Sequence, residues 1–193
     1  MARKKIEFKP DPTGGGILNK LYITPKQRKT IRKWLCYSLV CVACLVIQDS
    51  VLGRARLFGG MVDLASAAIA LICVLEGSES GGVFALAASA VFVFSGSAPD
   101  DFSIALLTVY GCLAALFRES FLRRGFPSAW LCAGTAVVLY EISVFALGLL
   151  RGVTYLGRMG AFGITAALSV AVMPVLYPLL RRIGKIGGET WKE

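Results

Sequence analysis

The sequence contains no histidine, and it contains little charge over most of its length. Without imidazole there can be no Ser-His-Asp or Cys-His catalytic group, no histidine zinc ligand and no imidazole proton relay. Charged residues make up 17% of the 193 residues, against about 25% in an average soluble domain. No lysine occurs between Lys33 and Lys185, which removes Ser-Lys chemistry from the apolar part of the chain. We therefore expect no enzymatic activity.

Cysteine is present, but not in a pattern that indicates a disulfide framework or a metal site. All 6 cysteines fall in or beside apolar stretches, where they act as small hydrophobic residues. Cys41 and Cys44 form a C-x-x-C pair, yet no second pair follows. The sequence thus predicts neither a bound metal nor a cofactor.

Apolar residues make up 56% of the chain, and its positive charge is concentrated at the two ends. Residues 1–34 carry a net charge of +8, residues 35–180 a net charge of −1, and residues 181–193 a net charge of +2. A soluble nucleic-acid-binding protein would instead distribute basic residues over a folded surface. The pattern indicates an integral membrane protein that binds no nucleic acid and has both ends in the cytoplasm.

The chain divides into three parts. Residues 1–33 form a basic segment whose Pro- and Gly-rich stretch cannot hold regular structure, so we expect most of it to be disordered. Near its end, Thr24, Pro25 and Gln27 have the pattern of a helix start, and the basic residues that follow would meet anionic lipid headgroups. Residues 34–180 form the transmembrane domain, and residues 181–193 form a cytoplasmic tail.

The transmembrane domain is predicted to be a bundle of six helical spans, at 34–52, 61–76, 81–97, 101–117, 129–150 and 159–180. The connections between them are too short to build a domain outside the membrane. Spans two to four have 16 or 17 residues, fewer than the roughly 20 that a helix needs to cross the hydrocarbon. With both termini inside, 13 basic residues near the span ends lie in the cytoplasm and 4 lie outside, which favours this orientation.

Glu141 is the most deeply placed charge, twelve residues into the fifth span. A charge near the bilayer centre costs about 2.5–3.5 kcal/mol on insertion scales, so we expect Glu141 to face the bundle interior. Two interpretations stay open: a site for a substrate or proton, and a neutral acid hydrogen-bonded to Ser, Thr or backbone. Asp49 and Asp63, near the outer ends of the first two spans, are expected to form interfacial ion pairs with Arg54 and Arg56.

Small residues recur at helical spacing in the sixth span and form one stripe: Gly160, Gly163, Ala167, Ala171, Pro174 and Pro178. Such stripes let helix backbones approach closely in a bilayer, where burial from water gives no driving force. The stripe either packs within the bundle or docks a transmembrane helix of a partner. The sequence alone does not decide between these two roles.

Four stretches between Trp34 and Arg182 resemble the rod shape-determining protein MreD family of bacteria. The first combines residues 45–50 (LVIQDS) with residues 56–64 (RLFGGMVDL), and the second is the short Gly-rich turn at residues 76–82 (EGSESGG). The third is residues 94–99 (FSGSAP) with Tyr110, Gly111 and Arg118, and the fourth is residues 173–182 (MPVLYPLLRR). The region that contains them, Trp34 to Arg182, spans about three quarters of the chain, and they follow the order of the family. Glu141 does not match a residue of the family pattern.

The resemblance implies an all-α bundle similar to the substrate-binding S components of energy-coupling factor vitamin transporters. It also implies a non-catalytic role in the cell-elongation complex of the bacterial cytoplasmic membrane, supporting lateral peptidoglycan synthesis and cell shape. The implied partners are MreC and the other membrane proteins of that complex, together with membrane lipids.

A second interpretation is that the chain is itself an S component that binds a vitamin. That function needs a polar cavity near the outer face, and few residues are available to line it: Glu141, Asp49, Asp63, Ser95, Tyr110 and Tyr140. An intramembrane aspartyl enzyme would need a carboxylate dyad, and the two aspartates lie too near the span ends. Packing stripes are abundant and polar residues scarce, so the sequence favours the scaffold.

Overall fold

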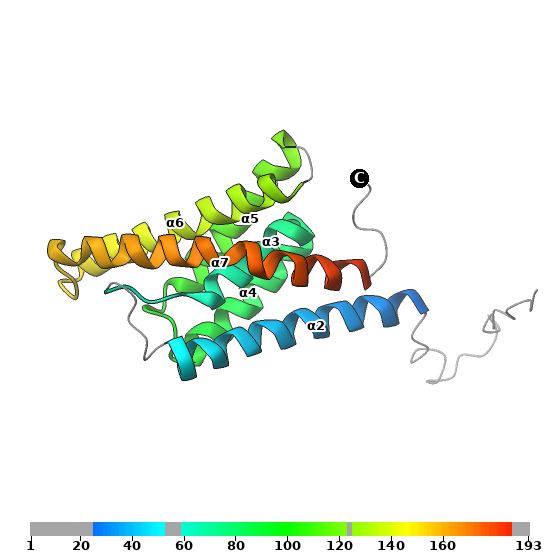
Figure 1. The fold of residues 1–193 in the computed structure, drawn as a ribbon, viewed down its shortest axis with the longest axis horizontal. Helices are drawn as coiled ribbons and strands as arrows, with labels where there is room; N and C mark the ends of the chain where they lie inside the picture. The colour runs from blue at the N-terminus through cyan, green and yellow to red at the C-terminus, as the bar shows by residue number, and fades with distance from the viewer. Residues whose placement is uncertain (1–24, 53–58, 123–124, 187–193) are drawn as a thin grey trace, which may run out of the picture.

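The computed structural model describes residues 25–52, 59–122 and 125–186. Within these ranges the protein is a bundle of α-helices (Figure 1). Along the chain the α-helices are α2 (Pro25–Ile47), α3 (Leu64–Glu76), α4 (Ser78–Phe94), α5 (Ser103–Phe121), α6 (Phe126–Leu150) and α7 (Met159–Ile186). A π-helical turn, η1 (Gln48–Leu52), extends α2, and a 3-10 turn, η2 (Leu156–Arg158), precedes α7. The helix predicted after Thr24 is present from Pro25, the first described residue, whereas Thr24 itself lies with residues 1–24 and 187–193 outside the described residues.

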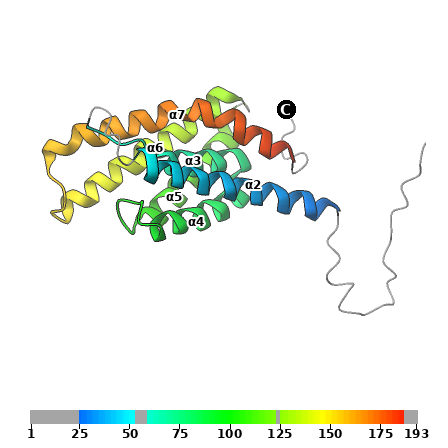
Figure 2. The same cartoon turned by 60° about the horizontal axis from the view of Figure 1, so that its bottom comes forward.

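Successive helices run in opposite directions, so the bundle has two ends. Lys33 near the start of α2 contacts Glu76 at the end of α3, and the start of α2 and the end of α7 lie on the same side in Figures 1 and 2. We call this the basic end, after its described residues Arg28, Lys29, Arg32, Lys33, Arg118, Arg181, Arg182 and Lys185. We call the other the acidic end, after Asp49, Asp63, Asp100, Asp101 and Glu141.

Four helical segments are long and apolar enough to cross a membrane: Gln27–Leu52, Ser103–Phe121, Phe126–Leu150 and Leu156–Ile186. The protein is therefore a candidate multi-pass membrane protein. Helices α3 and α4 are shorter, with 13 and 17 residues. At 1.5 Å per residue, α3 extends only about 20 Å, against about 30 Å of hydrocarbon.

Helix α3 is enclosed by the rest of the bundle (Figure 2). Every residue from Leu64 to Glu76 is buried, and α3 contacts each of the other five helices. Glycines allow this close approach, because a Cβ on Gly81 of α4 would lie 2.5 Å from the Cys73 carbonyl oxygen. On α5, a Cβ on Gly111 would lie 3.2 Å from the Cys73 Sγ. Helix α3 is thus core and does not face lipid.

An extended segment completes the path of α3. Gly59–Asp63 is not helical, and its backbone is held against α7: the Met61 N–H donates to Thr165 Oγ1 at 3.1 Å, and the Asp63 N–H donates to Ser169 Oγ at 3.0 Å. Such bonds are what a non-helical backbone needs at membrane depth, where water cannot satisfy its polar groups. The segment continues the path of α3 toward the acidic end (Figure 1).

Candidate functional site

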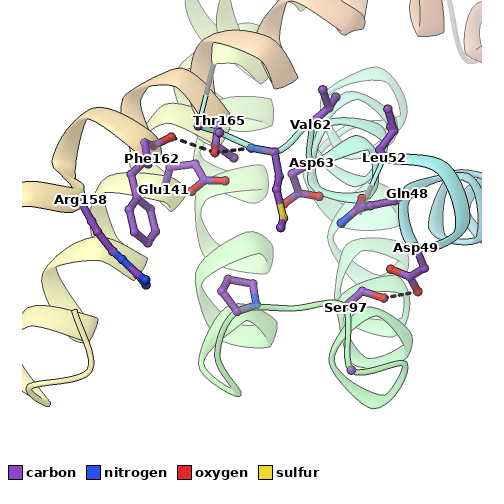
Figure 3. Close-up of a pocket in the computed structure, with 16 residues that line it drawn as sticks. Gln48, Asp49, Leu52, Val62, Asp63, Ser97, Glu141, Arg158, Phe162 and Thr165 are labelled. Carbon is purple, nitrogen blue, oxygen red and sulfur yellow. Dashed lines mark hydrogen bonds between the residues drawn. The ribbon is translucent and has the colours of Figure 1, made fainter. Parts of the chain in front are cut away.

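A cavity of about 520 Å³ lies at the acidic end (Figure 3). Its walls come from η1, the extended segment before α3, the loop between α4 and α5, α6, η2 and the first turns of α7. Small-molecule sites in proteins are usually about 300–1,000 Å³, so the volume suits a small ligand. The polar side chains that line it are Gln48, Asp49, Asp63, Ser97, Glu141, Arg158 and Thr165.

Asp63 and Gln48 stabilise the N-terminus of α3, whose first N–H groups have no partner within the helix. The Asp63 Oδ1 accepts the N–H of Ser66 at 3.0 Å as an N-cap, and the Gln48 Oε1 accepts the N–H of Ala65 at 2.9 Å. Asp63 is only 7% exposed, and its negative charge is favoured beside the positive end of the helix dipole. Asp63 is therefore a buried cap, which the sequence analysis did not anticipate.

Asp49 lies exposed at the rim of the cavity. Its Oδ2 accepts a hydrogen bond from Ser97 Oγ at 2.7 Å, which ties η1 to the loop after α4. We expected ion pairs of the two aspartates with Arg54 and Arg56, but both arginines lie outside the described residues.

Glu141 faces the interior of the bundle, as the cost of a charge in the membrane predicts. Its side chain points into the cavity in Figure 3, and the residue is 5% exposed. Among the residues that the structure describes, no donor bonds to its carboxyl group. The interpretation of Glu141 as an acid hydrogen-bonded to Ser, Thr or backbone thus finds no partner in the described ranges.

Arg158 gives the cavity one positive group. The residue is exposed, and its guanidinium carbon lies 5.5 Å from the centre of the Tyr155 ring. The buried part of the cavity therefore carries acidic groups, and an exposed residue of its wall carries a cation.

Three residues that the sequence analysis considered for this cavity do not line it. The Tyr140 hydroxyl donates to Ser103 Oγ at 3.0 Å inside the bundle, and Tyr110 is hydrogen-bonded to Ser143 at 2.7 Å. Ser95 donates to the Phe92 carbonyl oxygen. Conversely, sequence reasoning missed Ser97, Arg158 and Thr165. Gln48 and Ser97 carried a signal, since they belong to the first and third stretches that resemble MreD.

The small-residue stripe of α7 faces outward. All six of its residues are exposed, and a Cβ on Gly160 or Gly163 would have no neighbouring atom within 4 Å. The face of α7 that packs in the bundle is a different one, formed by Ala166, Ser169, Met173, Tyr177, Leu180, Ile183 and Gly184. The interpretation of this stripe as packing within the bundle is therefore wrong for the described chain, and the docking interpretation stays open.

The basic end contains a second buried charge cluster, and its groups are paired. Lys33 forms a buried ion pair with Glu76, whose other oxygen accepts a hydrogen bond from the Tyr37 hydroxyl at 2.7 Å. The Lys33 Nζ also lies 5.0 Å from the centre of the Trp34 ring. Nearby, Arg118 Nη1 donates to the Val74 carbonyl oxygen at 2.7 Å. The cluster joins α2, α3 and α5. Its acid, Glu76, is paired within the cluster and does not line the cavity at the acidic end.

Comparison of the chain with protein-family models, with curated proteins and with solved structures finds no match. The geometry shows an all-helical bundle with four candidate membrane-spanning helices, a polar cavity at one end and an outward-facing stripe of small residues.

Proposed function

We propose that the protein is a non-catalytic membrane scaffold of the bacterial cell-elongation complex, located in the cytoplasmic membrane and supporting lateral peptidoglycan synthesis. The four stretches that resemble MreD support the assignment to cell elongation. The outward-facing stripe on α7 supports the mode of action, because it is a helix face that no other helix of the described chain covers.

In this proposal all six helices cross the membrane, with the basic end in the cytoplasm. Among the described residues, the basic end carries nine Lys and Arg residues, Lys26 included, whereas the acidic end carries Arg151 and Arg158. This difference follows the rule that basic residues stay on the cytoplasmic side. Helix α3 crosses inside the bundle, and the extended segment before it supplies the missing length.

The partner in this proposal is a transmembrane helix of MreC or of another membrane protein of the complex. Helices associate in lipid by close backbone packing, which small residues permit. Gly163, Ala167 and Ala171 lie on consecutive turns of the exposed face. A partner helix could therefore approach the backbone of α7 closely at these turns.

The docking face is tested by filling it. The double variant Ala167→Leu/Ala171→Leu should abolish copurification with MreC and produce wide or round cells, while the bundle stays folded because both positions are exposed. Ala146→Leu, at an exposed position of α6, is the matched control and should leave both readouts unchanged. Normal copurification and normal shape with the double variant would exclude this face as the docking site.

The process is tested by depletion. Loss of the protein from a rod-shaped host should widen or round the cells and leave vitamin uptake intact. Cells that keep their shape but require added vitamin would contradict the scaffold function.

The cavity at the acidic end favours a second candidate, the S component of an energy-coupling factor transporter. The cavity brings Asp49, Asp63 and Glu141 together with Gln48 and Arg158, which is a richer polar lining than the sequence suggested. An S component should copurify with paired ATPases and bind a vitamin tightly. A scaffold should instead copurify with MreC and the elongation synthases.

A further inference from the structure

We propose that the cavity at the acidic end binds a small zwitterion, whose primary ammonium group contacts Glu141 and whose anionic group contacts Arg158. The observation that carries this proposal is Glu141, a residue only 5% exposed, whose carboxyl group has no hydrogen-bond partner among the described residues and points into a cavity of about 520 Å³ (Figure 3). The proposal goes beyond the scaffold function and does not depend on it.

Glu141 and Asp63 both line the cavity, but of these two only Asp63 accepts a hydrogen bond from a described residue. The Asp63 carboxylate accepts the Ser66 N–H and lies at the positive end of the α3 dipole. Glu141 lies in the middle of α6, away from any helix end, and is 5% exposed. The carboxyl group of Glu141 borders the cavity, so a donor supplied by a ligand can reach it.

An ammonium group fits this donor role better than a metal ion does. Within the described ranges, no three Cys, Asp or Glu side chains are grouped closely enough to hold a metal, whereas hard cations such as Ca²⁺ take six to eight oxygen ligands. A primary ammonium carries three N–H donors and needs fewer acceptors. Its positive charge would be balanced by Glu141, with Asp63 in the same cavity adding negative potential.

Arg158 supplies the complementary charge for the other part of the ligand. It is exposed and has no ion-pair partner among the described residues, so its guanidinium group is available to bind an anion. Guanidinium groups bind phosphate and carboxylate through two parallel hydrogen bonds. Phe162, which lies beside Arg158 and Glu141 in Figure 3, provides apolar wall for a short carbon chain.

Two sources offer this chemistry: the headgroup of an aminophospholipid in the leaflet at the acidic end, and a free solute such as an amino acid or a phosphorylated amino alcohol. Phosphoethanolamine represents both, because it is the headgroup of phosphatidylethanolamine and is itself soluble.

The test uses the full chain in nanodiscs of phosphatidylglycerol, a lipid without an amine. Calorimetric titration with O-phosphoethanolamine should show saturable binding to one site. Glu141→Gln should weaken this binding by about tenfold or more, because it removes a charge-assisted hydrogen bond. Asp101→Asn, which removes an exposed acid of the same end that does not line the cavity, should leave the affinity unchanged.

The two charged groups of the ligand can be tested separately. Arg158→Gln should weaken the binding of O-phosphoethanolamine but leave the binding of ethanolamine, which has no anionic group, unchanged. Equal effects on the two probes would overturn the zwitterion proposal. If Glu141→Gln does not fold, Ala161→Leu replaces it, since a larger side chain on that wall should block the probe without any change in charge.

Nanodiscs of phosphatidylethanolamine distinguish the sources. If the headgroup of this lipid fills the cavity, O-phosphoethanolamine should no longer bind there, and native mass spectrometry should detect retained lipid that Glu141→Gln loses. If a free solute is the ligand, the soluble probe should bind equally in both lipids. Failure of the wild-type protein to bind the probe or retain the lipid would overturn the proposal. That result would leave the α7 docking experiment unaffected.

Discussion

Two buried glutamates at opposite ends of the bundle have opposite surroundings. Glu76 at the basic end is paired with Lys33 and accepts a hydrogen bond from Tyr37. Glu141 at the acidic end has no such partner in the described ranges and faces a cavity. Both residues are at most 9% exposed, so burial alone does not separate them. The difference teaches that the buried charges of the basic end are paired with one another, whereas Glu141 at the acidic end borders an open cavity.

The largest loss of stability is expected when the charge cluster of Lys33, Glu76 and Tyr37 is broken. Glu76→Gln leaves the buried Lys33 without its counter-charge, and loss of one member of a buried pair costs about 3–5 kcal/mol. The free energy of unfolding in detergent micelles measures the effect. Glu79→Gln, at an exposed acid in the first turn of α4, is the control and should change it by less than about 0.5 kcal/mol. Equal stability of the two variants would contradict the claim that the pair of Lys33 and Glu76 stabilises the basic end.

A smaller loss is expected from Tyr37→Phe, which keeps the ring and removes the hydroxyl that donates to Glu76. Hydrogen bonds to charged groups contribute about 1.5–3 kcal/mol. Tyr155→Phe, at an exposed tyrosine of the acidic end, provides the baseline in the same unfolding measurement. No difference between the two variants would show that the hydroxyl does not stabilise the pair.

A substitution in the wall of the cavity should lower the free energy of unfolding less than a substitution in the charge cluster of the basic end. Thr165→Val removes the acceptor of the Met61 N–H and should cost about 1 kcal/mol. Thr135→Val on the exposed face of α6 is the matched control. A loss as large as that of Glu76→Gln would mean that the extended segment, and not the charged cluster, limits stability.

The smallest effect is expected at Glu141. Because its carboxyl group has no partner in the described ranges, Glu141→Gln should change the free energy of unfolding by less than about 0.5 kcal/mol or raise it. Cell shape should also stay near normal. A loss of several kcal/mol would show instead that Glu141 has a structural partner, and the comparison of the two glutamates would fail.

The helical architecture and the inward direction of Glu141 could be predicted from the sequence, because each depends on local information. Apolar length marks a helix, and the cost of a charge in lipid determines which way it faces. The central position of α3 could not be predicted in this way. A helix that is apolar on all sides has the same pattern whether lipid or protein surrounds it. Only the glycines of α4 and α5 that contact Cys73 distinguish the two.

The cavity and the outward direction of the docking face could not be predicted, because they depend on contacts between residues far apart in the sequence. Met61 and Thr165, whose hydrogen bond forms one wall, are 104 positions apart. The stripe on α7 had the spacing of a packing face but gave no sign of its direction, since small residues suit internal and external partners equally. Its outward direction follows from Met173, Tyr177 and Leu180, whose larger side chains occupy the inner face.

The central claim is that the two ends lie on opposite sides of the membrane and that α3 crosses between them. A reporter that is active only outside the cytoplasm tests this most directly when it is inserted at positions of each end. It should be active after Gly96 or Gly152, and silent after Ser78, Leu122 or Lys185, because the latter positions lie at the basic end. Activity after Ser78 would show that α3 does not reach the cytoplasmic side, and activity after Lys185 would contradict the orientation of the whole bundle.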